Sequence, residues 1–372
     1  MRQLRRTGLA LGAPVLAAAL VAAVPVGGRA SISQSASPRA PRLAPAFSGL
    51  LDGVAATSAG NAWFVGNDDT NKTLIVHWNG HAWTRVAAPN PSPKNDTLAS
   101  ISAVSASDIW AVGAANGAVL ILHWNGKAWR RVTSPAPGEA LGVVALSATN
   151  AWAVGGTGGK ALIEHWNGHA WRSMPVPAPK SAELQSVAAS AAGNVWAVGV
   201  YLYGNANSKS GVLIVHWNGR TWRRVAAVNP FDSHLTGVSV LSATNAWAVG
   251  SYTNGTLTTH TLIEHWNGKA WTRAASPNPP EGAEFWGVAA RSASLAFAVG
   301  DTTPSFPNIG SVYIQKWNGH AWREVTSPPQ PPGFGFGVGF GSAKSAWIAA
   351  LNETSPLNST SLIEHWNGST WR

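Results

Sequence analysis

Residues 140–174 read ALGVVALSATNAWAVGGTGGKALIEHWNGHAWRSM, and this stretch decides the fold. Its phrase WNG-x-[AT]-W occurs seven times along the 372-residue chain, and a variant of AWAVG precedes each copy. The copies recur at a period of roughly 40–50 residues, which is typical of a β-propeller in which each repeat forms one blade. We therefore predict an all-β, seven-bladed β-propeller with four-stranded antiparallel blades over residues 48–372.

Turn residues divide this repeat into four short apolar runs, one for each strand of a blade. We name them strands a to d in chain order, at residues 141–146, 151–155, 161–166 and 169–174. Asn167 and Gly168 separate strands c and d. Asn-Gly between apolar runs predicts a two-residue type I′ turn, because both central positions of that turn need positive φ.

Twenty of the 21 Trp residues occupy three repeated positions, and only Trp286 lies outside them. With a two-residue turn, Val76 would face Trp83, and Trp78 would lie diagonal to Trp83 on the same face of the sheet. Strands rich in Val, Ile, Trp and Ala suit burial on both faces, so we interpret these rings as core between neighbouring blades. The repeated His and Glu residues of strand c are interpreted as structural too, because catalysis needs different groups converging on one spot.

The first 47 residues differ from the repeats. A basic start, MRQLRR, precedes an apolar stretch and small residues at a cleavage site, so residues 1–30 are predicted to be a secretory signal peptide. An uncleaved membrane anchor is the alternative, although Pro14 and Pro25 interrupt the apolar stretch. Residues 31–47 are rich in Ser, Pro and Ala and are predicted to be a linker, whose end at 42–47 would complete the last blade. We expect a secreted monomer with no membrane span after cleavage.

Composition limits the partners of the protein. The chain has no Cys, which excludes disulfides and thiolate metal sites. Its formal charge is +10, but only 11% of residues are charged, and many Lys and Arg lie in or near strand d, where they protect a sheet edge. Nucleic acid is therefore not an expected partner, whereas attraction to an anionic envelope polymer remains an alternative. No cofactor is expected, and a metal stays open because Asp68 and Asp69 could bind calcium.

The loops between strands b and c predict where a ligand would bind. These loops are short in repeats 1–3 and about twice as long in repeats 4–7. Loops on a rigid scaffold carry binding residues, and non-repeated aromatic and polar residues gather in and around the long ones. We therefore predict a ligand site near blades 4–7, on the face of the b–c loops and d–a connections, formed by Tyr201, Tyr203, Asp232, His234, Tyr252, His260, Trp286 and Asp301.

The phrases SATNAWAVG and LIEHWNG-x-AW resemble those of secreted bacterial propeller proteins with tandem repeats, and the architecture is similar to kelch-type and sialidase-type propellers. The resemblance implies a fold and an exported location rather than an activity. It is incomplete, because residues 105–110 lack the spacing of a sialidase Asp box and a chain without Cys cannot form the Cys–Tyr crosslink of kelch-type copper oxidases.

These observations favour a binding or scaffold module over an enzyme. We predict an exported, non-catalytic propeller whose partner is a glycan, a cell-envelope polymer or a protein, and we assign no catalytic residue. The alternative is a glycoside hydrolase or polysaccharide lyase with a site in the axial pocket of the same face. Such an enzyme would need two carboxyl groups about 5–10 Å apart, flanking the scissile bond.

Overall fold

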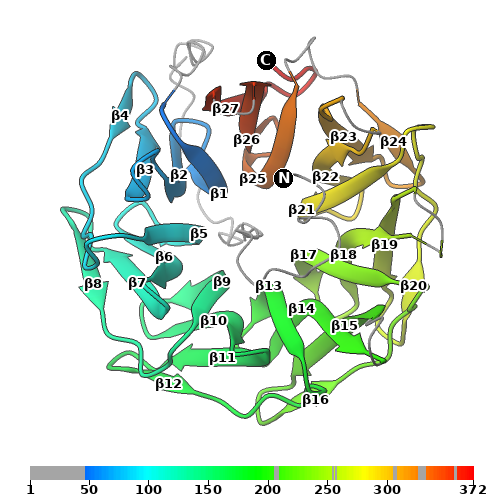
Figure 1. The fold of residues 1–372 in the computed structure, drawn as a ribbon, viewed down its shortest axis with the longest axis horizontal. Helices are drawn as coiled ribbons and strands as arrows, with labels where there is room; N and C mark the ends of the chain where they lie inside the picture. The colour runs from blue at the N-terminus through cyan, green and yellow to red at the C-terminus, as the bar shows by residue number, and fades with distance from the viewer. Residues whose placement is uncertain are drawn as a thin grey trace, which may run out of the picture.

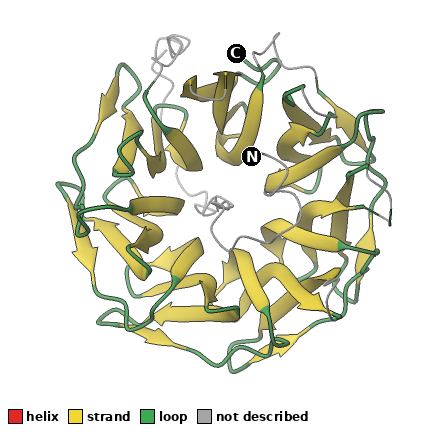
Figure 2. Ribbon diagram, viewed as in Figure 1, coloured by secondary structure: helices red, strands yellow, loops and turns green. Residues whose placement is uncertain are grey.

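The computed structural model describes residues 47–204, 209–253, 255, 258–304, 308–325, 332–355 and 358–372. These residues contain strands β1 to β27 and no helix. The strands form seven antiparallel sheets arranged radially around one axis (Figures 1 and 2). The protein is a seven-bladed β-propeller, as the repeat count predicted.

Each blade begins at the axis and ends at the rim. The innermost strands are β1 (Leu50–Ser58), β5 (Asp96–Ser105), β9 (Glu139–Ser147), β13 (Ala182–Ala191), β17 (Ser233–Ser242), β21 (Ala283–Ser292) and β25 (Gly333–Ser342). The second strands are β2 (Asn61–Asn67), β6 (Asp108–Ala115), β10 (Asn150–Thr157), β14 (Asn194–Tyr203), β18 (Asn245–Tyr252), β22 (Leu295–Thr302) and β26 (Ser345–Ser355). The third are β3 (Thr73–Trp78), β7 (Ala118–Trp124), β11 (Lys160–Trp166), β15 (Lys209–Trp217), β19 (His260–Trp266), β23 (Val312–Trp317) and β27 (Asn358–Trp366). The outermost are β4 (Trp83–Arg85), β8 (Trp129–Val132), β12 (Trp171–Ser173), β16 (Trp222–Arg224), β20 (Trp271–Arg273) and β24 (Trp322–Glu324).

The last blade has three named strands, β25, β26 and β27, and both ends of the described chain flank β27. Trp371 bridges to Trp366 at one end of this strand, and Ser48 bridges to Thr360 at the other. The Phe47 carbonyl also accepts a hydrogen bond from the Ser361 amide at 3.0 Å. Residues 42–46 lie outside the described residues, so the predicted domain boundaries stay predictions.

The predicted two-residue turn between strands c and d is wrong. Trp166 lies directly opposite Trp171, so four residues, 167–170, form the loop. The Asn167 Oδ1 atom accepts the amides of His169 and Ala170, each at 3.0 Å, and within this loop only Gly168 has positive φ, at +92°. The asparagine side chain thus takes over hydrogen bonding that a type I′ turn leaves to the backbone. In the first repeat the loop also sets Trp78 opposite Trp83, not diagonal to it.

The repeated aromatic residues form the core between blades, as predicted. The side chain of Trp152 is 1% exposed, and its ring stacks on His165 with centroids 4.1 Å apart. Its other face meets the next blade, where the Trp222 ring lies edge-on at 5.3 Å. The His165 Nε2 atom hydrogen bonds with Asn150 Oδ1 at 3.0 Å, so this repeated histidine is a structural partner of the core.

Repeated carboxylates of strand c tie down the connections between blades. The buried Glu164 carboxylate accepts the Ser134 hydroxyl at 2.8 and 3.0 Å, and the buried Glu264 carboxylate accepts the Val228 amide at 3.2 Å. Each donor lies in the connection that leads from the preceding blade into the blade of the carboxylate. These contacts are structural, in line with the interpretation of the repeated Glu residues.

The innermost strands meet in a tight ring of Gly and Ser. Its members are Gly53, Ser100, Gly142, Ser186, Gly237, Gly287 and Gly337, one from each blade. A Cβ atom on Gly337 would lie 2.8 Å from the Asp52 carbonyl oxygen, which is too close for any larger residue. Ser100 Oγ accepts the amide of Val143 from the next blade at 2.9 Å. This ring therefore joins each blade to its neighbours and closes blade 7 onto blade 1.

Candidate binding site at the axial mouth

The strand register brings together residues that do not repeat from blade to blade. We call the half-buried residues at or near the start of each innermost strand the mouth ring: Leu50, Thr97, Glu139, Glu183, His234, Glu284 and Phe334. We call the bulged residues two positions later the bulge ring: Asp52, Ala99, Leu141, Gln185, Thr236, Trp286 and Phe336. Both rings lie toward the face that carries the b–c loops. Different groups converging around one axis are what a binding or catalytic site requires.

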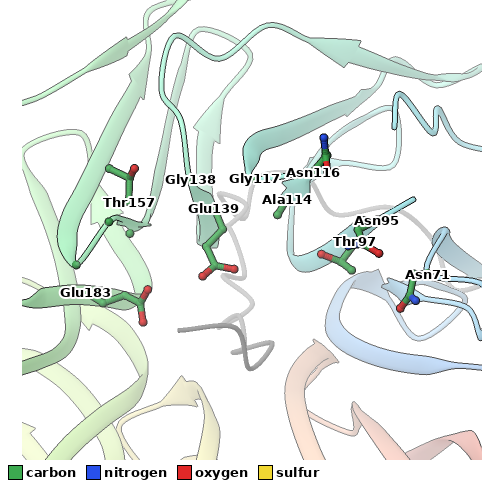
Figure 3. Close-up of a pocket in the computed structure, with 13 residues that line it drawn as sticks. Asn71, Asn95, Thr97, Ala114, Asn116, Gly117, Gly138, Glu139, Thr157 and Glu183 are labelled. Carbon is green, nitrogen blue, oxygen red and sulfur yellow. The ribbon is translucent and has the colours of Figure 1, made fainter. Parts of the chain in front are cut away.

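A cavity of about 550 Å³ opens on this face beside the axis. Glu139 and Glu183 line one side, and Asn71, Asn95 and Thr97 approach from the other (Figure 3). The lining also includes residues 156–159, the short Gly-rich b–c connection of blade 3. Short loops on blades 1–3 leave this space open, so the cavity lies on the opposite half of the face from the predicted long-loop site.

Two carboxyl groups share this cavity. Glu139 pairs directly with Gly156 across the sheet, and a Cβ atom on Gly156 would lie 2.6 Å from the Oε1 atom of Glu183. Gln185 Nε2 donates to Glu183 Oε2 at 2.8 Å. Burial, with the nearby Glu139 charge, raises the pKa of Glu183 to about 7, and burial also raises the pKa of Glu139. The Glu183 carboxyl therefore titrates near neutral pH.

We expect Glu183→Gln to stabilise the protein at about pH 8 but not at about pH 4.5. Glu183 has a folded-state pKa of about 7 against an ordinary value of 4.5, so rising pH ionises the unfolded state first and favours unfolding. The difference should be on the order of 2 kcal/mol, because partial exposure reduces the full shift. Urea midpoints at both pH values measure it. Glu324→Gln, the same substitution at an exposed position of β24, is the matched control.

A second acidic pair lies in blade 6. Glu284 and Asp301 are directly opposite each other, and the nearly buried Asp301 accepts the Trp286 Nε1 proton at 2.5 Å between N and Oδ1. Burial, followed by the charge of Glu284, raises the pKa of Asp301 well above its ordinary range. The predicted site residues Trp286 and Asp301 are thus in direct contact. A third predicted residue, His234, belongs to the mouth ring, and burial lowers its pKa.

The predicted aromatic residues fall into local groups near the ends of their blades. The Tyr201 and Tyr203 rings lie 5.7 Å apart, and the Arg224 guanidinium lies 4.7 Å from the Tyr201 ring centre. In the next blade Tyr252 and His260 lie 5.2 Å apart. Each group is held by its own blade, so their joint use of one ligand stays a prediction.

Arg273 and Asp232 complete the long-loop half of the face. The Arg273 side chain hydrogen bonds with the Tyr252 hydroxyl and covers its ring at 4.4 Å. Asp232 has positive φ, at 54°, and its Oδ1 atom accepts the amide and hydroxyl of Ser210 at 3.0 and 2.8 Å. The predicted site residue Asp232 therefore holds the start of β15 in place.

The site predicted from the sequence did not include Glu139, Glu183, Gln185 or Asp52. Each innermost strand reads x-φ-x-[GS]-[VI], where φ is apolar or Gly, and the two x positions vary between repeats. Aligning the repeats on the Gly or Ser would have identified these positions. Asp52 is the most unusual of them, because neither of its buried carboxyl oxygens has a hydrogen-bond partner and burial raises its pKa well above the ordinary range.

In the part of the chain that the structure describes, no group of three or more His, Asp or Glu side chains is placed to hold a metal ion. In the same residues, no helix has the length and apolar character needed to cross a membrane.

No protein-family model and no curated protein matches this chain. Among solved structures it is similar to "YCF48 bound to D1 peptide", with a TM-score of 0.58 and 15% identity, over 87% of this chain and 95% of that one. YCF48 from Cyanidioschyzon merolae gives a TM-score of 0.56 and 16% identity, over 84% and 95% of the two chains. The RRP9 WD40 repeats give a TM-score of 0.56 and 10% identity, over 87% of this chain and 96% of that one. These identities support the propeller fold alone, and the kelch-type or sialidase-type assignment stays a prediction.

Proposed function

We propose that this protein is an exported, non-catalytic binding propeller that holds a peptide or a glycan on the face of its b–c loops. The observation that carries the proposal is the convergence of non-repeated polar residues around a cavity of about 550 Å³ at the axial mouth. Propellers of similar fold include one described with a bound peptide and one built from WD40 repeats, which fits a binding role. The ligand would contact the mouth and extend toward the aromatic residues of blades 4–7.

A binding screen of the purified chain against peptide, glycan and cell-wall-polymer arrays tests this function. We expect the ligand found to lose roughly tenfold in affinity when one good stacking ring is removed, which corresponds to about 1.4 kcal/mol. The variant for the long-loop half combines Tyr201→Ala, Tyr252→Ala and Trp286→Ala, and the variant for the cavity combines Glu139→Gln and Glu183→Gln. Their separate effects locate the ligand on the face.

The control changes lie on the outer strands. Arg130→Ala with Arg223→Ala removes two exposed charges from β8 and β16 and should leave the affinity for a neutral ligand unchanged. If these rim changes abolish binding while the mouth and aromatic changes do not, the partner is an anionic polymer held by charge. In that case the loop face is the wrong site.

One observation favours an enzyme as the second candidate. Glu183, with a pKa near 7, and Glu139 line one cavity, and a protonated acid beside a second carboxyl is the arrangement that glycosidases use. Polysaccharide hydrolysis by the purified chain would support it, provided that Glu183→Gln removes turnover and keeps substrate binding. Binding without turnover in the unmodified protein would contradict it.

A further inference from the structure

The two rings at the mouth are acidic in composition, whereas the chain as a whole is basic. Asp52, Glu139, Glu183 and Glu284 lie in these rings, which contain no Lys or Arg. The chain as a whole has 26 Lys and Arg against 16 Asp and Glu. The axis therefore concentrates carboxyl groups on a basic protein, and those that ionise attract cations to this point.

Glu183 and Gln185 keep free hydrogen-bond acceptor capacity beside the cavity. In the described part of the chain, neither Glu139 nor Glu183 forms an ion pair, and the only side-chain donor to Glu183 is Gln185 Nε2. Gln185 is 6% exposed, and its Oε1 atom has no partner. A buried acceptor without a donor is costly, so a ligand that donates several hydrogen bonds would be favoured here.

The opposite side of the mouth is apolar. Phe334 and Phe336 of β25 have ring centres 6.4 Å apart, and Leu50 of β1 and Trp286 of β21 occupy the same rings in the two neighbouring blades. In Figure 1, β25 lies across the axis from β9 and β13, the strands of Glu139 and Glu183. The cavity side of the mouth thus carries Glu139 and Glu183, whereas the side of β25 carries the aromatic rings, with Asp52 and Glu284 in the two blades beside it.

We infer that the axial mouth binds the side chain of a Lys or Arg residue presented by a peptide. Its cationic head would contact Glu139, Glu183 and the Gln185 carbonyl oxygen, and its apolar stem would lie against Phe334 and Phe336. A long, unbranched side chain offers an apolar stem to the aromatic residues and a charged head to the carboxyl groups. The inference rests on the proposed binding function and specifies the ligand of the same site.

The test uses three probes and isothermal titration of the purified chain. The first is a capped five-residue peptide with arginine between two phenylalanines. The second is the same peptide with citrulline, which keeps the shape but has no charge, and the third is a chitosan oligomer, a cationic sugar. Each probe is titrated into the unmodified protein and into Glu139→Gln, Glu183→Gln and Glu324→Gln, which each replace one carboxyl group by an amide.

We expect the arginine peptide to bind at least tenfold more tightly than the citrulline peptide. Glu139→Gln and Glu183→Gln should each lower the affinity for the arginine peptide about tenfold, whereas Glu324→Gln should leave it unchanged. The melting temperature should show that all variants fold. Equal affinity for the two peptides, equal loss in Glu324→Gln, or no binding of the arginine peptide would overturn the inference. Tighter binding of chitosan than of the arginine peptide would also overturn the inference, because the ligand would then be an amino sugar and not a peptide. The proposed function would still hold in each of these cases if the array screen found a neutral ligand whose binding requires the aromatic residues.

Discussion

Replacing Trp152 by Ala should lower the free energy of unfolding by about 3–5 kcal/mol, the range for removing a large aromatic side chain from a core. Trp152 is almost fully buried and contacts three rings: His165 of its own blade, and Trp217 and Trp222 of the next, at 5.0 and 5.3 Å. Its removal leaves a void at the junction of two blades, so both lose packing. Chemical denaturation followed by circular dichroism measures the effect.

Two further variants show whether the loss comes from this junction. Trp152→Phe should recover most of the stability, because blade 6 already uses Phe297 at the same repeated position, fully buried against Phe340. Phe231→Ala removes a ring that is 40% exposed and should change stability by less than about 1 kcal/mol. A loss for Trp152→Ala no larger than that of Phe231→Ala would contradict the inter-blade role.

Replacing Gly155 by Ala should cost about 3 kcal/mol and also disturb the mouth. A Cβ atom on Gly155 would lie 2.0 Å from the carbonyl oxygen of Glu139 and 2.9 Å from the Cα atom of Ala140. The bulge of β9 brings this backbone against β10, so relief of the clash must move the strand that carries Glu139. The thermal melting temperature and the affinity of any mouth ligand should fall together.

Gly193→Ala is the matched control. Its Cβ atom would meet its nearest neighbour, the Cα atom of Gly219, at 3.6 Å, which is an ordinary contact on an exposed turn. This variant should keep both the melting temperature and the ligand affinity of the unmodified protein. If Gly155→Ala behaves in the same way, the bulge does not set the position of Glu139.

Local sequence patterns predicted part of the structure. The number of blades followed from WNG-x-[AT]-W, because each copy marks one hairpin and one blade. The interpretation of Trp152 as core held because a repeated apolar ring must be buried in every blade. The predicted hairpin register was wrong, because the Asn167 side chain accepts hydrogen bonds from two amides and the loop has four residues. The Asn-Gly pair alone does not reveal this.

The predicted site residues show a different limit. Trp286 and Asp301 were chosen for lying near long loops, and their hydrogen bond depends on pairing within blade 6. Glu139 and Glu183 lie 44 positions apart in the sequence and belong to different blades. They share one cavity because the register and bulges of β9 and β13 place them at equivalent heights in adjacent blades.

The sequence by itself determined the seven blades, the strand order within each blade and the aromatic core, because all three follow from a motif repeated over short distances. Only the tertiary structure decided which non-repeated residues meet at the axis. Closing the ring brings strands from distant repeats into contact through Gly and Ser at the axis. This closure sets β9 and β13, the strands of Glu139 and Glu183, across from β25, the strand of Phe334. Which residues lie together at the axis depends on the curvature and register of all seven blades, and no single repeat encodes these.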